Sequence, residues 1–88
     1  MYSVEFSKQA DMDIARLKKS IPKISEKIQS LIKELEEHPY IGTGHPEPLK
    51  GNYSGCYSRR ITHKHRLIYE VNEDKVLVYI LSAYGHYD

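Results

Sequence analysis

The chain has 88 residues, of which 40% are hydrophobic and 28% charged. This composition is typical of a soluble globular protein, and we expect residues 1–88 to form one domain. The formal net charge is only +1, so overall charge does not indicate a nucleic-acid-binding protein.

Cysteine use and hydropathy predict the compartment. The chain has 1 cysteine, which excludes an internal disulfide and suits a reducing environment. The longest apolar run is too short to span a bilayer, and the first residues show no signal-peptide pattern. We therefore expect a cytoplasmic protein without membrane association.

The N-terminal half predicts a strand and two helices. Residues 2–6 alternate between apolar and polar side chains, as a half-buried strand does, and Ser7 can cap the helix that follows. Pro22 is placed to open a second helix at its first turn, and Pro39 to end it. Two apolar stripes at helical spacing, with Asp11 and Asp13 outside the first, predict an antiparallel helical hairpin. The stripes are Ala10, Ile14, Leu17 and Ile21, then Ile24, Ile28, Leu31, Ile32 and Leu35.

The C-terminal half predicts three strands. Residues 40–54 have the composition of a loop, whereas residues 56–62 can be extended. A turn over 62–64 leads to a strand over 65–71, and a second turn leads to an apolar strand over 75–82, expected to be central and covered on both faces. The predicted order is β-α-α-β-β-β, an α+β fold with a mainly antiparallel sheet and the hairpin on one face. The other face is left for a ligand.

Basic residues gather in the segment from Glu47 to Arg66. If residues 62–64 form the hairpin loop, Arg60 lies directly opposite Arg66 on one sheet face. Opposed like charges are unfavourable, so this pairing favours a bound anion. The alternative is a solvated strand edge whose charges discourage aggregation, and composition alone favours that alternative. The bases are Lys50, Arg59, Arg60, Lys64 and Arg66, with Glu47 as the single acid.

Motifs in and after this segment resemble a known family. The chain contains, in order, the blocks G-T-G-H-P-E-P-L-K, N-Y-S-G-C-Y-S-R-R-I-T, H-R-L-I-Y and a late G-H-Y. Together they resemble the YoeB family of toxins from bacterial toxin–antitoxin pairs, within the RelE/ParE superfamily. The resemblance is dense over residues 42–71 and returns at 85–87. It implies a RelE-like fold of the microbial-ribonuclease kind.

The resemblance also implies an activity and partners. Such a toxin is an endoribonuclease that cleaves mRNA in the ribosomal A site without a metal or other cofactor. A cognate antitoxin, a small acidic protein, neutralises it. A homodimer is left open.

Three residues match the catalytic positions of the family. The resemblance implies that Glu47 is the general base, which takes the proton from a ribose 2′-hydroxyl. His86 would protonate the departing 5′ oxygen, and Arg66 would stabilise charge on the phosphorane. Metal-free cleavage needs these types, because a proton acceptor and donor must flank phosphorus while cations stabilise the transition state.

Further residues are candidates for binding. Lys50 and Arg60 match positions that contact phosphate, and Tyr87 would position His86 or stack on a base, as Tyr84 also could. Cys56 is expected to be a packed residue rather than a nucleophile. The candidate contacts to ribosomal RNA, more often simply a solvated helix face, are Lys18, Lys19, Lys23 and Lys27.

Two other functions compete with the ribonuclease. The first is a ParE-like toxin that binds a topoisomerase without cleaving RNA. The second is a catalytically inactive module that binds RNA or protein. The presence of Glu47, Arg66 and His86 together argues against both, because the first class generally lacks this set and the second would have lost a member.

Overall fold

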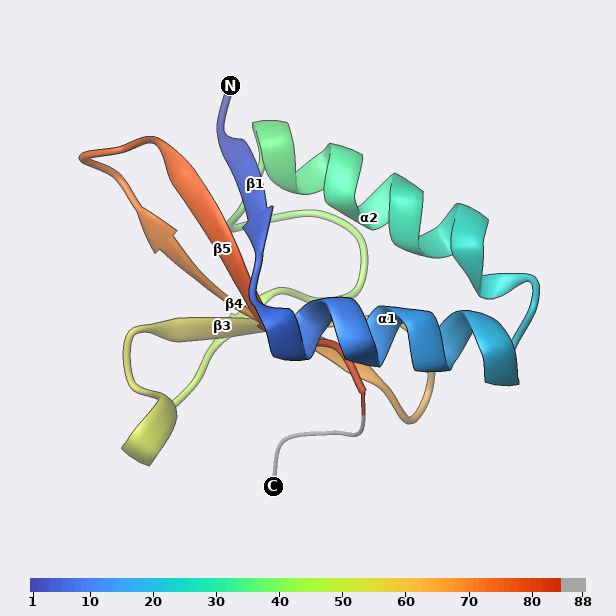
Figure 1. The fold of residues 1–88 in the computed structure, drawn as a ribbon. Helices are drawn as coiled ribbons and strands as arrows, with labels where there is room; N and C mark the ends of the chain where they lie inside the picture. Colours follow the sequence, from blue (N-terminus) through green and yellow to red (C-terminus); the bar gives the residue numbers. More distant parts are fainter. Residues whose placement is uncertain (85–88) are drawn as a thin grey trace.

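The structure is a computed structural model and describes residues 1–84, which form two helices and five strands (Figure 1). Both helices lie along the same side of the sheet and run in opposite directions, as the predicted hairpin requires. Neither helix within these residues has the length and apolarity that a bilayer span requires. The elements are β1 (Ser3–Phe6), α1 (Lys8–Ser20), α2 (Ile24–Glu37), β2 (Glu47–Pro48), β3 (Cys56–Arg60), β4 (Arg66–Asn72) and β5 (Leu77–Ser82).

The sheet is mixed, with the strand order β1-β5-β4-β3-β2. Strand β1 runs parallel to β5, and the other neighbouring pairs are antiparallel. The predicted α+β class with a mainly antiparallel sheet is therefore confirmed. The sheet has one strand more than predicted, because β2 forms within the segment that we expected to be a loop.

Local capping sets the ends of α1. The Ser7 hydroxyl accepts a hydrogen bond from the backbone N–H of Ala10 at 2.9 Å, as predicted, and donates one to the carbonyl of Leu81 at 2.8 Å. The acidic Asp11 lies in the first turn and Lys18 and Lys19 in the last, which complements the helix dipole. One side chain thus begins the helix and ties it to the end of β5.

Helix α2 begins two residues later than predicted. Pro22 lies in the turn before the helix, which starts at Ile24 with Lys23 as its N-cap. The helix ends at Glu37, because residues before a proline are disfavoured in helical conformation and Pro39 follows. The predicted apolar stripe of α2 is confirmed as its buried face, formed by Ile24, Ile28, Leu31 and Leu35.

The core lies between the helices and one face of the sheet. Leu67, Tyr69, Val78 and Ile80 from β4 and β5 are fully buried against the apolar stripes of both helices. On β5, Val78 and Ile80 are buried whereas Leu77, Tyr79 and Leu81 are only half-buried. Strand β5 is interior, as predicted, but the expectation that both of its faces are covered is wrong. The opposite face of the sheet carries only a small cluster around Leu49, Cys56 and Ile68.

Asp13 is buried in this core, although we placed it outside the apolar stripe. It is 6% exposed, and its carboxylate accepts hydrogen bonds from the backbone N–H of Ala83 at 3.0 Å and from the Gln9 amide at 2.8 Å. Ala83 is itself fully buried. Helix α1 therefore supplies the acceptor that this backbone N–H would otherwise lack.

Replacement of Asp13 by alanine should lower the free energy of unfolding by about 1–3 kcal/mol, since the buried Ala83 N–H loses its acceptor. In a domain of this size each kcal/mol corresponds to about 4–8 °C in Tm, so thermal unfolding can detect the loss. Asp13→Asn keeps an acceptor oxygen and should lose less, and the exposed Asp74→Ala is the control. Equal Tm values for Asp13→Ala and Asp74→Ala would contradict the role given to Asp13.

Candidate active site

Glu47 lies on the face of the sheet that the helices leave open. It belongs to β2, where it pairs with Ser58 of β3, and Ser58 in turn pairs with Ile68 of β4. Paired residues share a face, so these three side chains form one row across the sheet. Ser58 and Ile68 are buried, whereas 61% of the Glu47 side chain is exposed. The Glu47 carboxylate therefore lies at the surface, above the buried residues Ser58 and Ile68, and is accessible to a ligand from solvent.

The two predicted arginines form the next row on the same face. Arg60 and Arg66 pair directly across β3 and β4, which confirms the predicted register. The Nη1 atom of Arg66 lies 3.8 Å from Oε1 of Glu47, with 24% of the arginine side chain exposed. This distance exceeds the 2.7–2.9 Å or so of a charge-assisted hydrogen bond, so the pair is loose. An anionic phosphate could compete with Glu47 for the guanidinium group.

Lys50 also lies near this edge of the sheet. It is exposed and directly precedes the 3₁₀ turn Gly51–Tyr53 that joins β2 to β3. Leu49 donates its backbone N–H to the carbonyl of Cys56 at 2.9 Å, which holds the chain at this point against β3. The predicted binding residues Lys50 and Arg60 are thus exposed at the sheet edge that carries Glu47.

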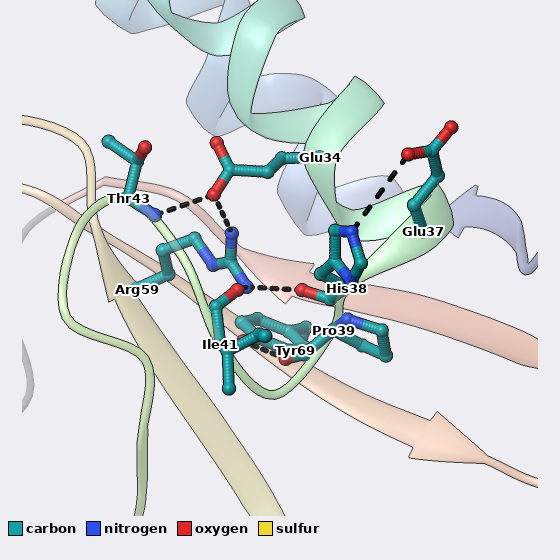
Figure 2. Close-up of polar contacts among 8 residues, drawn as sticks. All are labelled: Glu34, Glu37, His38, Pro39, Ile41, Thr43, Arg59 and Tyr69. Carbon is teal, nitrogen blue, oxygen red and sulfur yellow. Dashed lines mark hydrogen bonds and ion pairs between the residues drawn. The ribbon is translucent and has the colours of Figure 1, made fainter.

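Arg59 does not belong to the anion-binding cluster, contrary to our expectation. Because side chains alternate along a strand, Arg59 points to the helix side of β3, and it is fully buried. Its guanidinium group donates to the carbonyls of His38 at 2.7 Å and Ile41 at 2.9 Å, and lies 3.2 Å from Oε1 of Glu34 (Figure 2). Arg59 therefore binds groups of its own chain and is not available to a ligand.

Glu34, whose side chain is 25% exposed, completes this arrangement from α2. Its Oε1 atom also accepts the backbone N–H of Thr43 at 2.5 Å, so one carboxylate oxygen joins the helix, β3 and the loop that leads to β2 (Figure 2). Nearby, the buried Tyr69 hydroxyl donates to the carbonyl of Pro39 at 2.6 Å. The position of Glu34 in the sequence predicts no role for it, because its spacing does not distinguish it from the other acids of the helix.

Comparison with known proteins identifies the family. Residues 6–87 match the family described as "YoeB-like toxin of bacterial type II toxin-antitoxin system". The chain belongs to this family. The toxin is 52% identical over 56 residues to "Toxin YoeB" of Escherichia coli (strain K12), which covers 64% of this chain and 67% of that relative.

Solved structures agree with the family. The fold of the toxin matches a YoeB/ParE toxin from Agrobacterium tumefaciens with a TM-score of 0.88 and 32% identity, covering 97% of this chain and 99% of that one. A Staphylococcus aureus relative, solved as a YoeB-YefM complex, is 38% identical with a TM-score of 0.81 and 99% coverage of both chains. That organism's relative has also been solved as a YoeB dimer.

The predicted residues His86 and Tyr87 lie outside the described residues, which end at Tyr84. The Tyr84 ring is half-buried and held within the toxin itself. The Arg16 guanidinium group lies 4.1 Å from the ring centroid, and the His65 ring lies 4.9 Å from it. Tyr84, which we considered as a stacking surface for a base, already has these two partners on its ring.

The four lysines that we considered as contacts to ribosomal RNA are all exposed. They lie at the end of the hairpin where α1 turns into α2, since the two helices are joined there (Figure 1). Their grouping follows from chain order, so a solvated helix end explains it as well as contact with ribosomal RNA does. The residues are Lys18, Lys19, Lys23 and Lys27.

Cys56 and the neighbouring histidines have ordinary structural surroundings. Burial raises the pKa of the Cys56 thiol, and the nearby Glu70 carboxylate raises it further, so the thiolate is disfavoured. The Nδ1 atom of His65 lies 2.9 Å from the Thr62 hydroxyl. Within residues 1–84, no three His, Cys, Asp or Glu side chains gather as a metal site would require.

The Glu34 contacts predict an acid-sensitive contribution to stability. Burial acts to raise the pKa of Glu34, but hydrogen bonds from Thr43 and the charge of Arg59 outweigh burial and lower this pKa below its ordinary value of 4.5. A carboxyl pKa that is lower in the folded state stabilises the fold above pH 4.5 or so, and this contribution is lost as pH falls through the folded pKa.

Glu34→Gln should therefore lower Tm at neutral pH, and the difference from the wild type should shrink below about pH 4.5. Thermal unfolding at a series of pH values measures this difference. The matched control is Glu37→Gln, one turn farther along the same helix, whose side chain is 62% exposed. A Glu34→Gln difference that stays constant through the acid range would contradict the assignment.

Proposed function

We propose that this toxin is a ribosome-dependent endoribonuclease that cleaves mRNA in the A site and thereby stops translation. The observation that carries the proposal is the loose Glu47–Arg66 pair of 3.8 Å on the open face of the sheet, with Arg60 directly opposite Arg66. A carboxylate beside one guanidinium group, with a second arginine on the neighbouring strand, suits a reaction in which a hydroxyl loses a proton while phosphate charge increases.

The proposed reaction assigns one step to each residue. Glu47 takes the proton of a ribose 2′-hydroxyl, and the resulting oxygen attacks the adjacent phosphorus. Arg66 moves from the Glu47 carboxylate to the phosphorane oxygens and stabilises their charge. The bond from phosphorus to the 5′ oxygen breaks, and His86 supplies a proton to that oxygen. The products are an RNA that ends in a 2′,3′-cyclic phosphate, or its hydrolysed form, and an RNA with a 5′-hydroxyl.

Other residues would bind rather than react. Lys50 and Arg60 contact the phosphate or its neighbours, and Tyr87 positions His86 or stacks on a base. Four lysines near the turn between the helices contact ribosomal RNA. Because ribosomes are the proposed target, the toxin acts in the cytoplasm. These lysines are Lys18, Lys19, Lys23 and Lys27.

The experiment that tests the function is a map of mRNA cleavage. Brief expression of the toxin, followed by primer extension on several mRNAs, should reveal new 5′ ends within translated codons. The same ends should be absent from an mRNA that carries no start codon and from cells whose ribosomes are blocked before elongation. Growth arrest without new mRNA ends, together with a DNA-damage response, would instead favour the topoisomerase-binding alternative.

We also propose a protein partner, because the S. aureus relative was solved as a YoeB-YefM complex. We expect a gene beside that of the toxin to encode a small acidic antitoxin whose C-terminal segment folds onto the basic open face. Binding should inhibit cleavage and raise the Tm of the toxin by mass action.

Co-expression and purification through a tag on either protein measures this interaction. Size-exclusion chromatography of the free toxin tests the homodimer, the state in which the S. aureus relative has also been solved. If the neighbouring gene product neither co-purifies nor restores growth, the antitoxin prediction is wrong, whereas the nuclease proposal stands.

A further inference from the structure

The strand that carries Glu47 has few hydrogen bonds of its own. Strand β2 has only two residues and lies at the edge of the sheet. Pro46 and Pro48, the neighbours of Glu47 in the chain, have no backbone N–H. Glu47 is therefore the only residue of the three that can donate a hydrogen bond to β3. The position of the Glu47 carboxylate must therefore be set largely by contacts of the flanking segments.

Downstream of β2, the Leu49 N–H donates to the Cys56 carbonyl at 2.9 Å, which holds the chain against β3. The upstream flank is residues 38–45, which connect α2 to β2 and cross over Arg59. The Arg60 N–H donates to the carbonyl of Gly44 at 2.7 Å, and this contact ties the segment to β3 just before Glu47.

Arg59 and Glu34 hold the rest of the upstream flank. The Nη2 atom of Arg59 donates to the carbonyls of His38 and Ile41, at 2.7 Å and 2.9 Å. The Glu34 carboxylate accepts the N–H of Thr43 at 2.5 Å and lies 3.2 Å from Nη1 of Arg59 (Figure 2). Together, the two side chains bind the segment at three separate places.

We propose that Arg59 and Glu34 are positioning residues, which hold the segment before β2 so that Glu47 stays beside Arg66. The proposal rests on the proposed function, in which Glu47 is the base. Arg59 acts from the helix side of β3, whereas its neighbours Ser58 and Arg60 lie on the open face, so Arg59 cannot touch the substrate.

The chemistry of the pair supports positioning over simple stabilisation. Arg59 is fully buried, whereas 25% of the Glu34 side chain is exposed. Burying the Arg59 charge opposes its attraction to Glu34, so such a pair is often no more stabilising than apolar residues of the same volume. Its directional bonds to two carbonyls and one N–H do what apolar packing cannot, which is to fix the path of a loop. A catalytic group displaced by about 1 Å can lose about a hundredfold in rate, so a fixed path matters at Glu47.

The test is a double-mutant cycle between the pair and Glu47, read by single-turnover cleavage on ribosomes. Two variants are used, Arg59→Met and Glu34→Gln, and Glu34→Gln is included because it should fold more readily. Each is measured in the wild-type and Glu47→Gln backgrounds. We expect each to lower the cleavage rate by about tenfold or more with ribosome affinity unchanged. In the Glu47→Gln background the same changes should have no further effect, because the base they position is gone. Glu37→Gln, beside Glu34 but exposed, is the control and should cleave at the wild-type rate.

Amide hydrogen exchange gives a readout that does not depend on activity. In both variants the N–H groups of Arg60 and Leu49 should exchange faster, while amides of the buried β5 residues Val78 and Ile80 keep their protection. Unchanged exchange at Arg60 and Leu49, or an equal rate loss in the Glu47→Gln background, would overturn the positioning role. A wild-type cleavage rate in Glu47→Gln alone would overturn the proposed function instead.

Discussion

Replacement of Glu47, Arg66 or His86 by alanine is expected to lower single-turnover cleavage of mRNA on the ribosome by about a hundredfold or more in each case. The losses correspond to removal of the base, of the cation that stabilises the phosphorane, and of the acid. Rapid mixing of excess toxin with ribosomes that hold a defined codon in the A site measures the chemical step directly.

The three losses should not add. Groups that act in one transition state are interdependent, so the double variant Glu47→Ala/Arg66→Ala should be only slightly slower than the slower single variant. Folding should survive, because the Glu47–Arg66 pair is loose at 3.8 Å and 61% of the Glu47 side chain is exposed, and surface pairs of this kind contribute about 0–1 kcal/mol. Thermal unfolding of each variant checks this point.

Matched controls carry the same charges at exposed positions. Glu70→Ala removes an exposed acid from β4, the strand that carries Arg66, and Lys75→Ala removes an exposed base from the turn before β5. Both should cleave at the wild-type rate. If any two of the three variants at Glu47, Arg66 and His86 fold and also cleave at that rate, the catalytic assignment is wrong.

Periodicity and turn residues were enough to predict most of the fold. The alternation of residues 2–6, the Ser7 cap and the stripe of α2 depend on local spacing, which a single sequence displays. The opposition of Arg60 and Arg66 followed from the turn over residues 62–64, because a hairpin loop sets the register of its strands.

Strand β2 was missed for a physical reason. A two-residue strand shows no alternation, and prolines such as its own Pro48 ordinarily argue against a strand except at a sheet edge. The loop that leads into it is held by the distant side chains of Glu34 and Arg59. No local pattern contains that information.

Asp13 and Arg59 were misplaced because we classed them by polarity rather than by position. Asp13 lies three residues after Ala10 and four before Leu17, so helical spacing already places it on the buried face. Arg59 precedes Arg60 on a strand, so alternation sends the two side chains to opposite faces. Once Arg60 was placed opposite Arg66 on the open face, Arg59 had to point to the helices.

Gly44→Ala is expected to be among the most destabilising single changes in the loop before Glu47. Gly44 has φ of +88°, and a Cβ atom there would lie 2.6 Å from the Arg60 carbonyl oxygen and 2.8 Å from Cγ of Arg59. Left-handed backbone costs a non-glycine residue about 1–2 kcal/mol, and overpacking a closed site costs about 1–3 kcal/mol. The sum corresponds to a fall in Tm of about 10 °C or more.

The Gly51→Ala variant separates the backbone contribution to destabilisation from the steric one. Gly51 also has a positive φ, of +66°, but a Cβ atom there meets nothing within 4 Å, so this variant should show the backbone term alone. Thermal unfolding of both variants gives the steric term by difference. Because Gly44 accepts the Arg60 N–H, its displacement should also move the start of β2 and lower cleavage, whereas Gly51→Ala should leave the upstream path to Glu47 intact. Equal Tm values for the two variants would show that the close approach at Gly44 does not restrict this loop.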